Sequence, residues 1–223
     1  MGWADVFSHR DCSLGLGDTL RGLGTASLLC NLTVMDKLSL RGTAFLYENP
    51  AHQKPWDPDY TYVASFAVTD ALSLSYENYA GNFYPWHRGP STGGKLADGL
   101  VRGSYTLPVN NTLFGAKAGS LPDFQMTAGV GDTFIGDPRA FVTTVVTPFP
   151  KVTLSATGNY YLDHSAQKQW DGDFYYTASY QVTERLAVQY NNYAATRWPW
   201  DHLPSTGGKV ADGSLLLIYT LPL

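Results

Sequence analysis

Residues 60–109 read YTYVASFAVTDALSLSYENYAGNFYPWHRGPSTGGKLADGLVRGSYTLPV, and the chain contains this stretch twice. Residues 174–223 read FYYTASYQVTERLAVQYNNYAATRWPWDHLPSTGGKVADGSLLLIYTLPL, and 25 of the 50 aligned positions are identical at a constant offset of 114 residues. The offset also relates Lys37 to Lys151, upstream of the aligned stretch. Self-similarity at a fixed spacing indicates repeated structural units. The sequence therefore predicts one domain over residues 1–223, with internal repeats at about 11–109 and 125–223.

Composition narrows the class of protein. Charged residues make up 15% of the chain and aromatic residues 14%, a balance that disfavours disorder. The net charge is -4 and no cluster of Lys and Arg is present, so we expect no nucleic-acid partner. No run of 18 apolar residues occurs, and the two cysteines fit no metal-ligand spacing. We therefore expect no transmembrane helix, no metal and no cofactor.

Apolar and polar residues alternate along most of the chain. In residues 37–47 the even positions are apolar or small and the odd positions mostly polar, and residues 151–160 repeat the pattern. A period of two is the signature of a β-strand with one apolar face. Each repeat divides into six such segments, which in the first repeat lie near residues 11–18, 24–34, 37–48, 59–69, 71–82 and 97–107.

The connections between these segments differ in length. Segments 24–34 and 37–48 are joined by Met35-Asp36, and segments 59–69 and 71–82 meet at Thr69-Asp70. About ten residues separate the third and fourth segments, and the longer FYPWHRGPSTGGK separates the fifth and sixth. Short turns thus gather at one end of the sheet and long loops at the other. The link between the repeats, around residues 110–121, is the exception because it is long and belongs to the short-turn end.

Twelve antiparallel segments with this arrangement resemble the bacterial outer-membrane β-barrels. YTYVASFAVTDALSLSYENY at residues 60–79 looks like one of their hairpins, with one apolar face and one face rich in Ser and Thr. The resemblance implies an all-β fold, a closed antiparallel transmembrane β-barrel of about twelve strands. It also implies a location in the outer membrane of a Gram-negative bacterium, with the signal peptide absent from this chain. Such barrels usually end in an aromatic residue, whereas this sequence ends in Leu223, which leaves its natural C-terminus open.

Two other arrangements produce the same alternation. A soluble β-sandwich or a closed soluble barrel also has strands with one apolar and one polar face. The membrane barrel is favoured because the loop lengths differ between the two ends and because the second face carries few charges.

A nearly identical loop occurs in both repeats. PSTGGKLADG at residues 90–99 returns as PSTGGKVADG at residues 204–213, preceded in both repeats by Pro-Trp. One interpretation is an extracellular loop that contacts a glycan or polymer, and the other is a loop that folds the same way twice and packs on the rim. The extracellular-loop candidates are Trp86, Lys95, Asp98, Trp200, Lys209 and Asp212.

Catalytic signals are weak. Asp163-His164-Ser165 resembles the His/Ser pairs of outer-membrane lipid hydrolases, but the first repeat has Asn49-Pro50-Ala51 there and no oriented third partner is evident. We therefore expect that the protein is not an enzyme.

The polar face carries the residues that would line a lumen. These candidates are Arg41, Glu77 and Arg102, with Asn191 as the counterpart of Glu77, and their placement predicts that charge lies on one half of the wall. They would give a polar channel with an asymmetric field, or an interior network that plugs the barrel.

Three functions are compatible with these features. The first is a channel or export conduit, a porin-like transport protein, for small polar solutes or polysaccharide. The second is a structural barrel that anchors a partner protein assembly in the outer membrane. The third is a soluble carbohydrate-binding β protein. Membrane lipid is a partner in the first two.

The two cysteines form a candidate disulfide. If the turn after segment 11–18 is centred on Arg21, paired positions sum to 42, and Cys12 then lies opposite Cys30. Directly opposed residues are within disulfide reach, and an exported protein folds in an oxidising compartment. The alternative is that both are small apolar residues facing lipid, because the second repeat has Met126 and Thr144 there.

Overall fold

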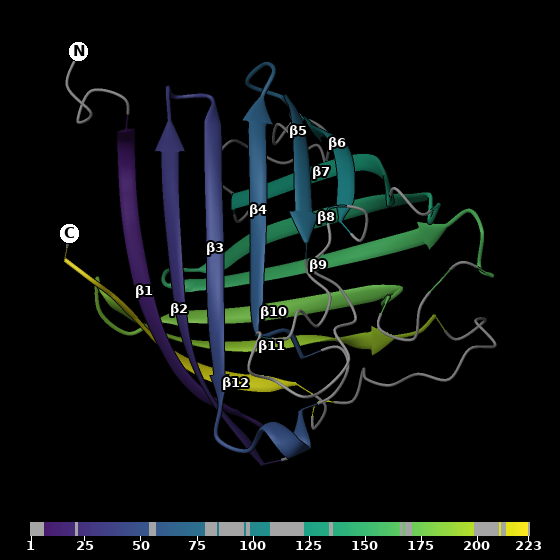
Figure 1. Ribbon diagram of the computed structural model, residues 1–223. Helices are drawn as coiled ribbons and strands as arrows, with labels where there is room; N and C mark the ends of the chain where they lie inside the picture. The colour runs from purple at the N-terminus through teal and green to yellow at the C-terminus, as the bar shows by residue number, and fades with distance from the viewer. Residues whose placement is uncertain are drawn as a thin grey trace.

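A computed structural model shows that the chain forms a closed barrel of antiparallel strands (Figure 1). It describes residues 7–20, 22–53, 57–78, 84, 96, 99–107, 123–133, 136–165, 167, 171–198, 210 and 213–222. These residues form twelve strands, as the sequence predicted, and a 3-10 turn, η2 (Pro50–His52). The strands of the first half are β1 (Phe7–Thr19), β2 (Leu23–Val34), β3 (Leu38–Tyr47), β4 (Tyr60–Ala67), β5 (Leu72–Asn78) and β6 (Leu100–Leu107). Those of the second half are β7 (Asp123–Thr133), β8 (Arg139–Phe149), β9 (Val152–Tyr161), β10 (Phe174–Gln181), β11 (Leu186–Thr196) and β12 (Ser214–Thr220).

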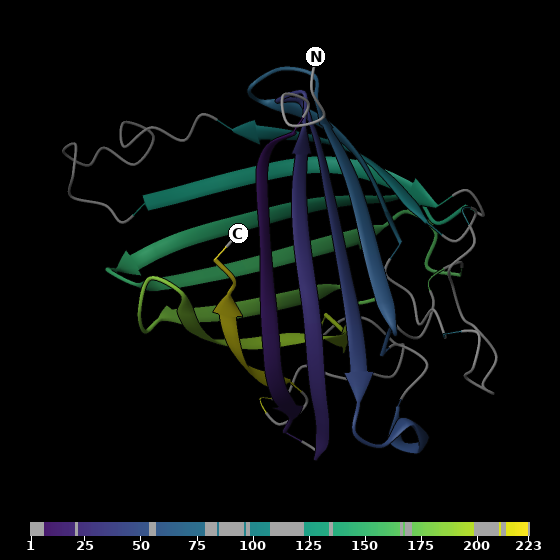
Figure 2. The same ribbon diagram turned by 60° about the vertical axis from the view of Figure 1, so that its left-hand side comes forward.

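Each strand pairs with its neighbours in sequence, and the ring closes where β12 lies beside β1 (Figure 2). The strands of the two walls cross steeply in Figure 1, as expected for a barrel whose strands are inclined to its axis. Closure matters because an open sheet would leave a row of unpaired backbone groups at each edge. Among the described residues, no helix is long and apolar enough to cross a membrane.

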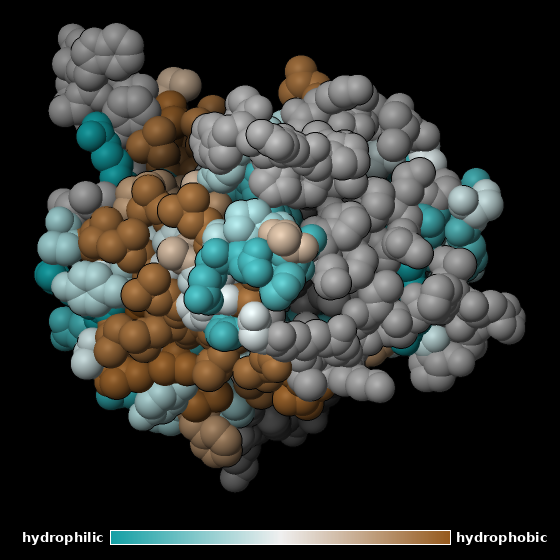
Figure 3. Space-filling model, turned by 60° about the horizontal axis from the view of Figure 1, so that its bottom comes forward, coloured by the Kyte–Doolittle hydropathy of each residue, from teal (hydrophilic) through white to brown (hydrophobic). Residues whose placement is uncertain are grey.

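Alternation along each strand separates an apolar outer face from a polar inner face. Leu74 is 50% exposed on the outer face, whereas Leu100, on the inner face, is fully buried. Apolar side chains therefore cover much of the outside, and they form a continuous area on the left of the view in Figure 3. Outer-face members of this set include Leu14, Leu16, Leu40, Phe66, Leu74, Val130 and Leu217.

Buried side chains are concentrated at one end of the barrel. Those within the described ranges lie in the half of the barrel nearer the long connections, or in those connections themselves. At the opposite end, the inner-face side chains of Ser39, Arg41, Gln125 and Thr153 are exposed to solvent. The interior is therefore packed at the long-loop end and reached by solvent at the short-turn end.

The two halves place their strands at matching positions. The bounds of β9 and β10 lie 114 residues after those of β3 and β4 at both ends. The ends of the predicted segments differ from those of the strands by no more than four residues. The largest difference among the described residues is at β1, which begins at Phe7 rather than residue 11 because it continues to pair with the full length of β2.

The register of the first hairpin is the one that the sequence predicted. The pairs from Thr19 with Leu23 down to His9 with Thr33 sum to 42, and Cys12 lies opposite Cys30. The two cysteines form a disulfide with their Cα atoms 4.1 Å apart. The bond joins neighbouring strands that the backbone ladder already holds together, so it reinforces a hairpin rather than creating a new connection.

The disulfide leads to a prediction about stability. Replacing both cysteines by alanine should leave the barrel folded, because the second half forms the equivalent β7–β8 hairpin with Met126 opposite Thr144. The loss should be at most about 3 kcal/mol, the entropy of closing a loop of roughly 18 residues in the unfolded chain. Urea unfolding followed by tryptophan fluorescence measures it, with the wild type under reducing conditions as the matched control. Failure of the double variant to form a barrel would contradict this account.

Candidate functional site

Arg102 and Glu77 form an ion pair on the inner wall. Their side chains project inward from β6 and β5, and Arg102 Nη2 lies 2.6 Å from Glu77 Oε1. The guanidinium also lies over the ring of Phe141 on β8, 4.9 Å from its centroid. Both charged side chains are less than a fifth exposed, so each largely neutralises the other.

Arg41 lies apart from that pair. It projects from β3 into the solvent-exposed part of the interior, where its Nε donates to Asn31 Oδ1 at 3.0 Å. Asn31 in turn donates through Nδ2 to Asp11 Oδ2 on β1 at 3.2 Å. The predicted residues are thus divided between a paired, buried site and an exposed one.

Asn191 is the fourth predicted lumen residue. It lies on the inner face of β11, and its Oδ1 accepts a hydrogen bond from Gln189 Nε2 at 2.6 Å. Serine and threonine hydroxyls pair in the same way across neighbouring strands of the inner wall. Examples are Ser73 with Ser104 at 2.7 Å and Thr143 with Thr157 at 2.9 Å. The inner wall is therefore mostly polar and uncharged.

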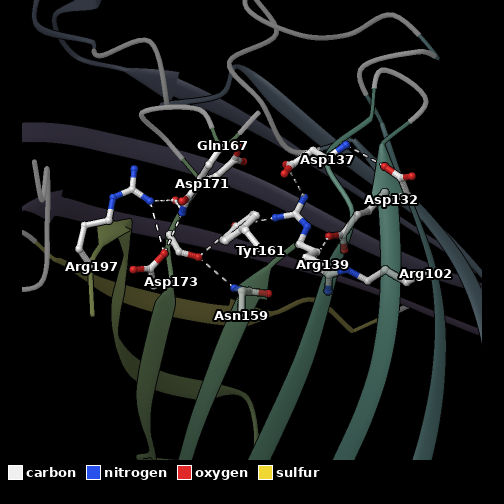
Figure 4. Close-up of polar contacts among 12 residues, drawn as sticks. Arg102, Asp132, Asp137, Arg139, Asn159, Tyr161, Gln167, Asp171, Asp173 and Arg197 are labelled. Carbon is white, nitrogen blue, oxygen red and sulfur yellow. Dashed lines mark hydrogen bonds and ion pairs between the residues drawn. The ribbon is translucent and has the colours of Figure 1, made fainter. Parts of the chain in front are cut away.

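The largest charged cluster was not predicted. At the start of β8, Arg139 Nη1 donates to the Tyr161 hydroxyl at 2.8 Å, and its guanidinium lies near the Asp137 carboxylate (Figure 4). Directly after β11, Arg197 Nη1 lies 3.6 Å from Asp173 Oδ1 and donates to the backbone carbonyl of Asp171. All six residues are buried. The expectation that charge lies only on the wall of the first repeat was therefore wrong.

Asp137 is a carboxyl group of this cluster whose pKa is raised. It lies in the connection between β7 and β8, where its backbone N–H donates to Asp132 Oδ1 at 2.8 Å. Burial, followed by the charge of the nearby Asp171 carboxylate, raises the pKa of Asp137 to about 6, although Arg139 acts in the opposite direction. Burial and the Asp171 carboxylate therefore favour the protonated form of Asp137.

A second unpredicted feature fastens the long connections to the barrel. Gln167 Nε2 donates to the Asp171 carbonyl at 3.1 Å and to Asp173 Oδ1 at 2.8 Å, and Asp173 Oδ2 accepts from the backbone of Trp198. In the first half, 114 residues earlier, Gln53 donates in the same way to the Asp57 carbonyl and Asp59 Oδ1, and Asp59 Oδ2 accepts from the backbone of Tyr84. The sequence signal is QKPWDPD at residues 53–59, which returns as QKQWDGD at residues 167–173.

The residue that follows each PSTGGK motif contacts a tyrosine of the outer wall. The Tyr76 hydroxyl donates to the Leu96 carbonyl at 3.1 Å, and in the other half Tyr190 donates to the Val210 carbonyl at 3.0 Å. A side chain at Gly99 or Gly213 would overlap the neighbouring tyrosine ring. The glycine at each of these positions is therefore needed for close packing against the tyrosine. Trp86, Lys95, Asp98, Trp200, Lys209 and Asp212 lie outside the described residues.

The Asp163-His164-Ser165 segment forms a local turn. Ser165 donates to Asp163 Oδ1 through both its backbone N–H, at 2.9 Å, and its hydroxyl, at 2.6 Å. The His164 ring packs edge-on against Tyr160, with the ring centroids 6.1 Å apart. The serine hydroxyl is thus bonded to the aspartate rather than to the histidine.

Comparisons with known proteins add a likeness in fold. The sequence matches no family model and no curated protein. A solved structure, the low-pH structure of Pseudomonas putida OprB, is similar over 95% of this chain and 91% of that chain, with 9% sequence identity and a TM-score of 0.36. At this level of similarity, function has to be inferred from the residues of the barrel itself.

The raised pKa of Asp137 predicts a pH dependence of stability. A folded-state pKa of about 6, against an ordinary value of 3.8, means that the folded state binds the proton more tightly than the unfolded state. This contribution is complete below about pH 4 and is lost as the pH rises through 6. The urea midpoint should therefore rise between pH 7.5 and pH 5, by the equivalent of about 1.4 kcal/mol, because one pKa unit of the shift lies in this window.

Asp137→Asn is the matched control for that titration. The amide cannot ionise, so the variant should lose most of the gain between pH 7.5 and pH 5. An unchanged pH profile in the variant would show that Asp137 is not the titrating group.

Proposed function

We propose that the protein spans the bacterial outer membrane as a channel for small polar solutes. The observation that carries the proposal is the contrast between an exposed apolar outer face and an inner face lined by Ser, Thr, Asn and Gln. Leu16, Leu46 and Val130 are 63%, 64% and 65% exposed, respectively. Large apolar side chains left uncovered around a closed barrel are expected where lipid is the surrounding solvent.

The lengths of the longer strands support the same proposal. β3 and β9 have 10 residues each, and β8 has 11. A membrane-crossing strand inclined by about 45° needs about 9–11 residues. In a hydrocarbon layer every backbone polar group has to be satisfied within the protein, and closure between β1 and β12 provides this.

Aromatic rings are placed where the outer wall approaches the long loops. Tyr62 and Tyr76 lie 6.0 Å apart between ring centroids, and Phe174 and Trp198 lie 4.9 Å apart. Tyr and Trp prefer the interface between hydrocarbon and water, because they have an apolar ring and a polar group. These positions fit one boundary of a membrane-embedded band.

The interior supports passage of polar rather than strongly charged solutes. Its wall carries paired hydroxyl and amide groups, and its buried arginines are matched with carboxylates. Arg41 is the exposed cation of the inner face among the predicted lumen residues. We therefore assign the electric field along the conduction path to Arg41, and a structural role to the ion pair Arg102–Glu77.

The alternative is a barrel that anchors a partner protein without conducting. The observation that favours it is the burial of Leu100, Phe141 and Tyr161 in the interior at the long-loop end. A packed end would block passage, and the barrel would then serve as a membrane-embedded support.

Planar-bilayer recording separates the two functions. The wild type should give discrete conductance steps, and Arg41→Ser should shift the reversal potential in a KCl gradient toward cations. The cation-to-anion permeability ratio should rise about tenfold, because a unit charge about 6 Å from the path in water contributes about 0.7 kcal/mol for each ion, with opposite signs for cation and anion.

The double variant Arg102→Met with Glu77→Gln is the matched control. It removes an ion pair of zero net charge, so the reversal potential should not change. A shift in this variant with none in Arg41→Ser would overturn the assignment of the field to Arg41. Reconstituted barrels that are silent under all conditions would instead support the anchoring function.

A further inference from the structure

Two equivalent pockets lie in the connections that follow β3 and β9. In the first, Gln53 Nε2 donates to the Asp57 carbonyl at 2.7 Å and to Asp59 Oδ1 at 2.8 Å. In the second, Gln167 makes the same two bonds to Asp171 and Asp173. The backbone N–H of Tyr84 closes the first pocket on Asp59 Oδ2 at 2.5 Å, as that of Trp198 closes the second on Asp173 Oδ2 at 2.7 Å.

One difference distinguishes the two pockets. In the second, the Arg197 guanidinium binds the same two oxygens as the glutamine amide, namely the Asp171 carbonyl and Asp173 Oδ1. The residue 114 positions earlier in the sequence is Phe83, which carries no charge. The second pocket thus holds a cation of its own, and the first has none at the matching sequence position.

The first pocket encloses a carboxylate with neutral donors. Asp59 is 3% exposed, and its two carboxylate oxygens accept from the Gln53 amide and the Tyr84 backbone. Within the described ranges of the chain, no Lys or Arg forms an ion pair with Asp59. Burying an ionised carboxylate without a countercharge is costly, which is the cost that Arg197 offsets at Asp173.

We propose that the pocket formed by Gln53, Asp57 and Asp59 binds a hard cation such as Ca²⁺, in the place that Arg197 fills in the second half. The ligands are the Asp57 carbonyl, the Asp59 carboxylate and the Gln53 side-chain carbonyl. Carboxylate, backbone carbonyl and amide oxygens are the ligands that Ca²⁺ takes in proteins, and water completes the coordination shell.

The Gln53 amide carries an oxygen that this site can use. Its Oε1 atom is buried and makes no hydrogen bond to the described residues, and neither does Oε1 of Gln167. Rotating the amide by half a turn directs Oε1 toward the Asp57 carbonyl and Asp59 Oδ1. That orientation would be repulsive without a cation and favourable with one, because three oxygen atoms then converge.

A cation at this place would fasten the connection after β3 to the segment that follows β5, since Asp59 also binds the Tyr84 backbone. The site has one carboxylate ligand, in keeping with the absence of any group of three or more His, Cys, Asp or Glu suited to a metal among the described residues. A small number of charged ligands predicts weak binding, with Kd of roughly 10⁻⁴–10⁻³ M, as in extracellular calcium modules.

Isothermal titration of the detergent-solubilised, folded barrel with CaCl₂ tests the proposal. The wild type should bind one Ca²⁺ per chain. Asp59→Asn should weaken binding at least tenfold, whereas the matched variant Asp173→Asn should bind as the wild type does. Arg197→Phe should create a second site, because it makes the second pocket like the first, and the stoichiometry should rise from one to two.

The titration either supports the proposal or overturns it. No saturable binding by the wild type overturns the proposal, as does equal binding by Asp59→Asn and the wild type. If Arg197→Phe does not fold, the comparison of Asp59→Asn with Asp173→Asn still decides the question. Binding is measured without a membrane or a conductance, so the result is independent of whether the barrel is a channel.

Discussion

Closure of the sheet between β1 and β12 is the constraint on which the rest of the structure depends. A closed antiparallel ring satisfies the backbone of every strand within the protein, and it also divides alternating side chains into an inside and an outside. Once the ring is closed, each strand has one side free to be apolar. Leu40 and Leu74 can then remain uncovered by protein, while Ser39 and Ser73 on the same strands turn inward. The contrast between the two faces, from which the membrane-spanning function is inferred, is a direct consequence of this geometry.

Arginine side chains inside the barrel form ion pairs with carboxylates. Arg102 is held by Glu77, and Arg197 by Asp173, so these interior cations have a carboxylate within ion-pair distance. Asp137 departs from this pattern, because its burial and the nearby Asp171 carboxylate raise its pKa although Arg139 lies beside it. Arg41 differs in another way, since it is exposed and bonded to the neutral Asn31. Charged side chains that form ion pairs stabilise the long-loop end. A solvated charge such as Arg41 can instead act on a passing solute.

Much of the fold could be predicted from the sequence because strand alternation and the repeat are local or periodic signals. The number of strands, the separation of short turns from long loops, and the pairing of Cys12 with Cys30 follow from counting positions. The charged cluster could not be predicted in the same way. Arg139 and Arg197 have Thr25 and Phe83 at the matching positions of the first half, so a comparison of the two repeats does not single out these arginines. Their partners come from separate connections that the closed barrel brings together at its long-loop end. The two Gln-Asp pockets could have been predicted, since the QKxWDxD pattern occurs twice. Their role depends on backbone contacts that no sequence pattern displays.

The central claim is that the even-numbered side chains of β3 face lipid and the odd-numbered ones face a polar interior. Fluorescence quenching by spin-labelled lipids tests it most directly, with an environment-sensitive dye attached to single cysteines in reconstituted protein whose native cysteines are bonded to each other. Leu40→Cys and Ala44→Cys should be quenched strongly, and Ser39→Cys and Thr43→Cys weakly, so that quenching alternates along the strand. Quenching that is equal at all four positions, or absent from all of them, would contradict a barrel that spans the membrane.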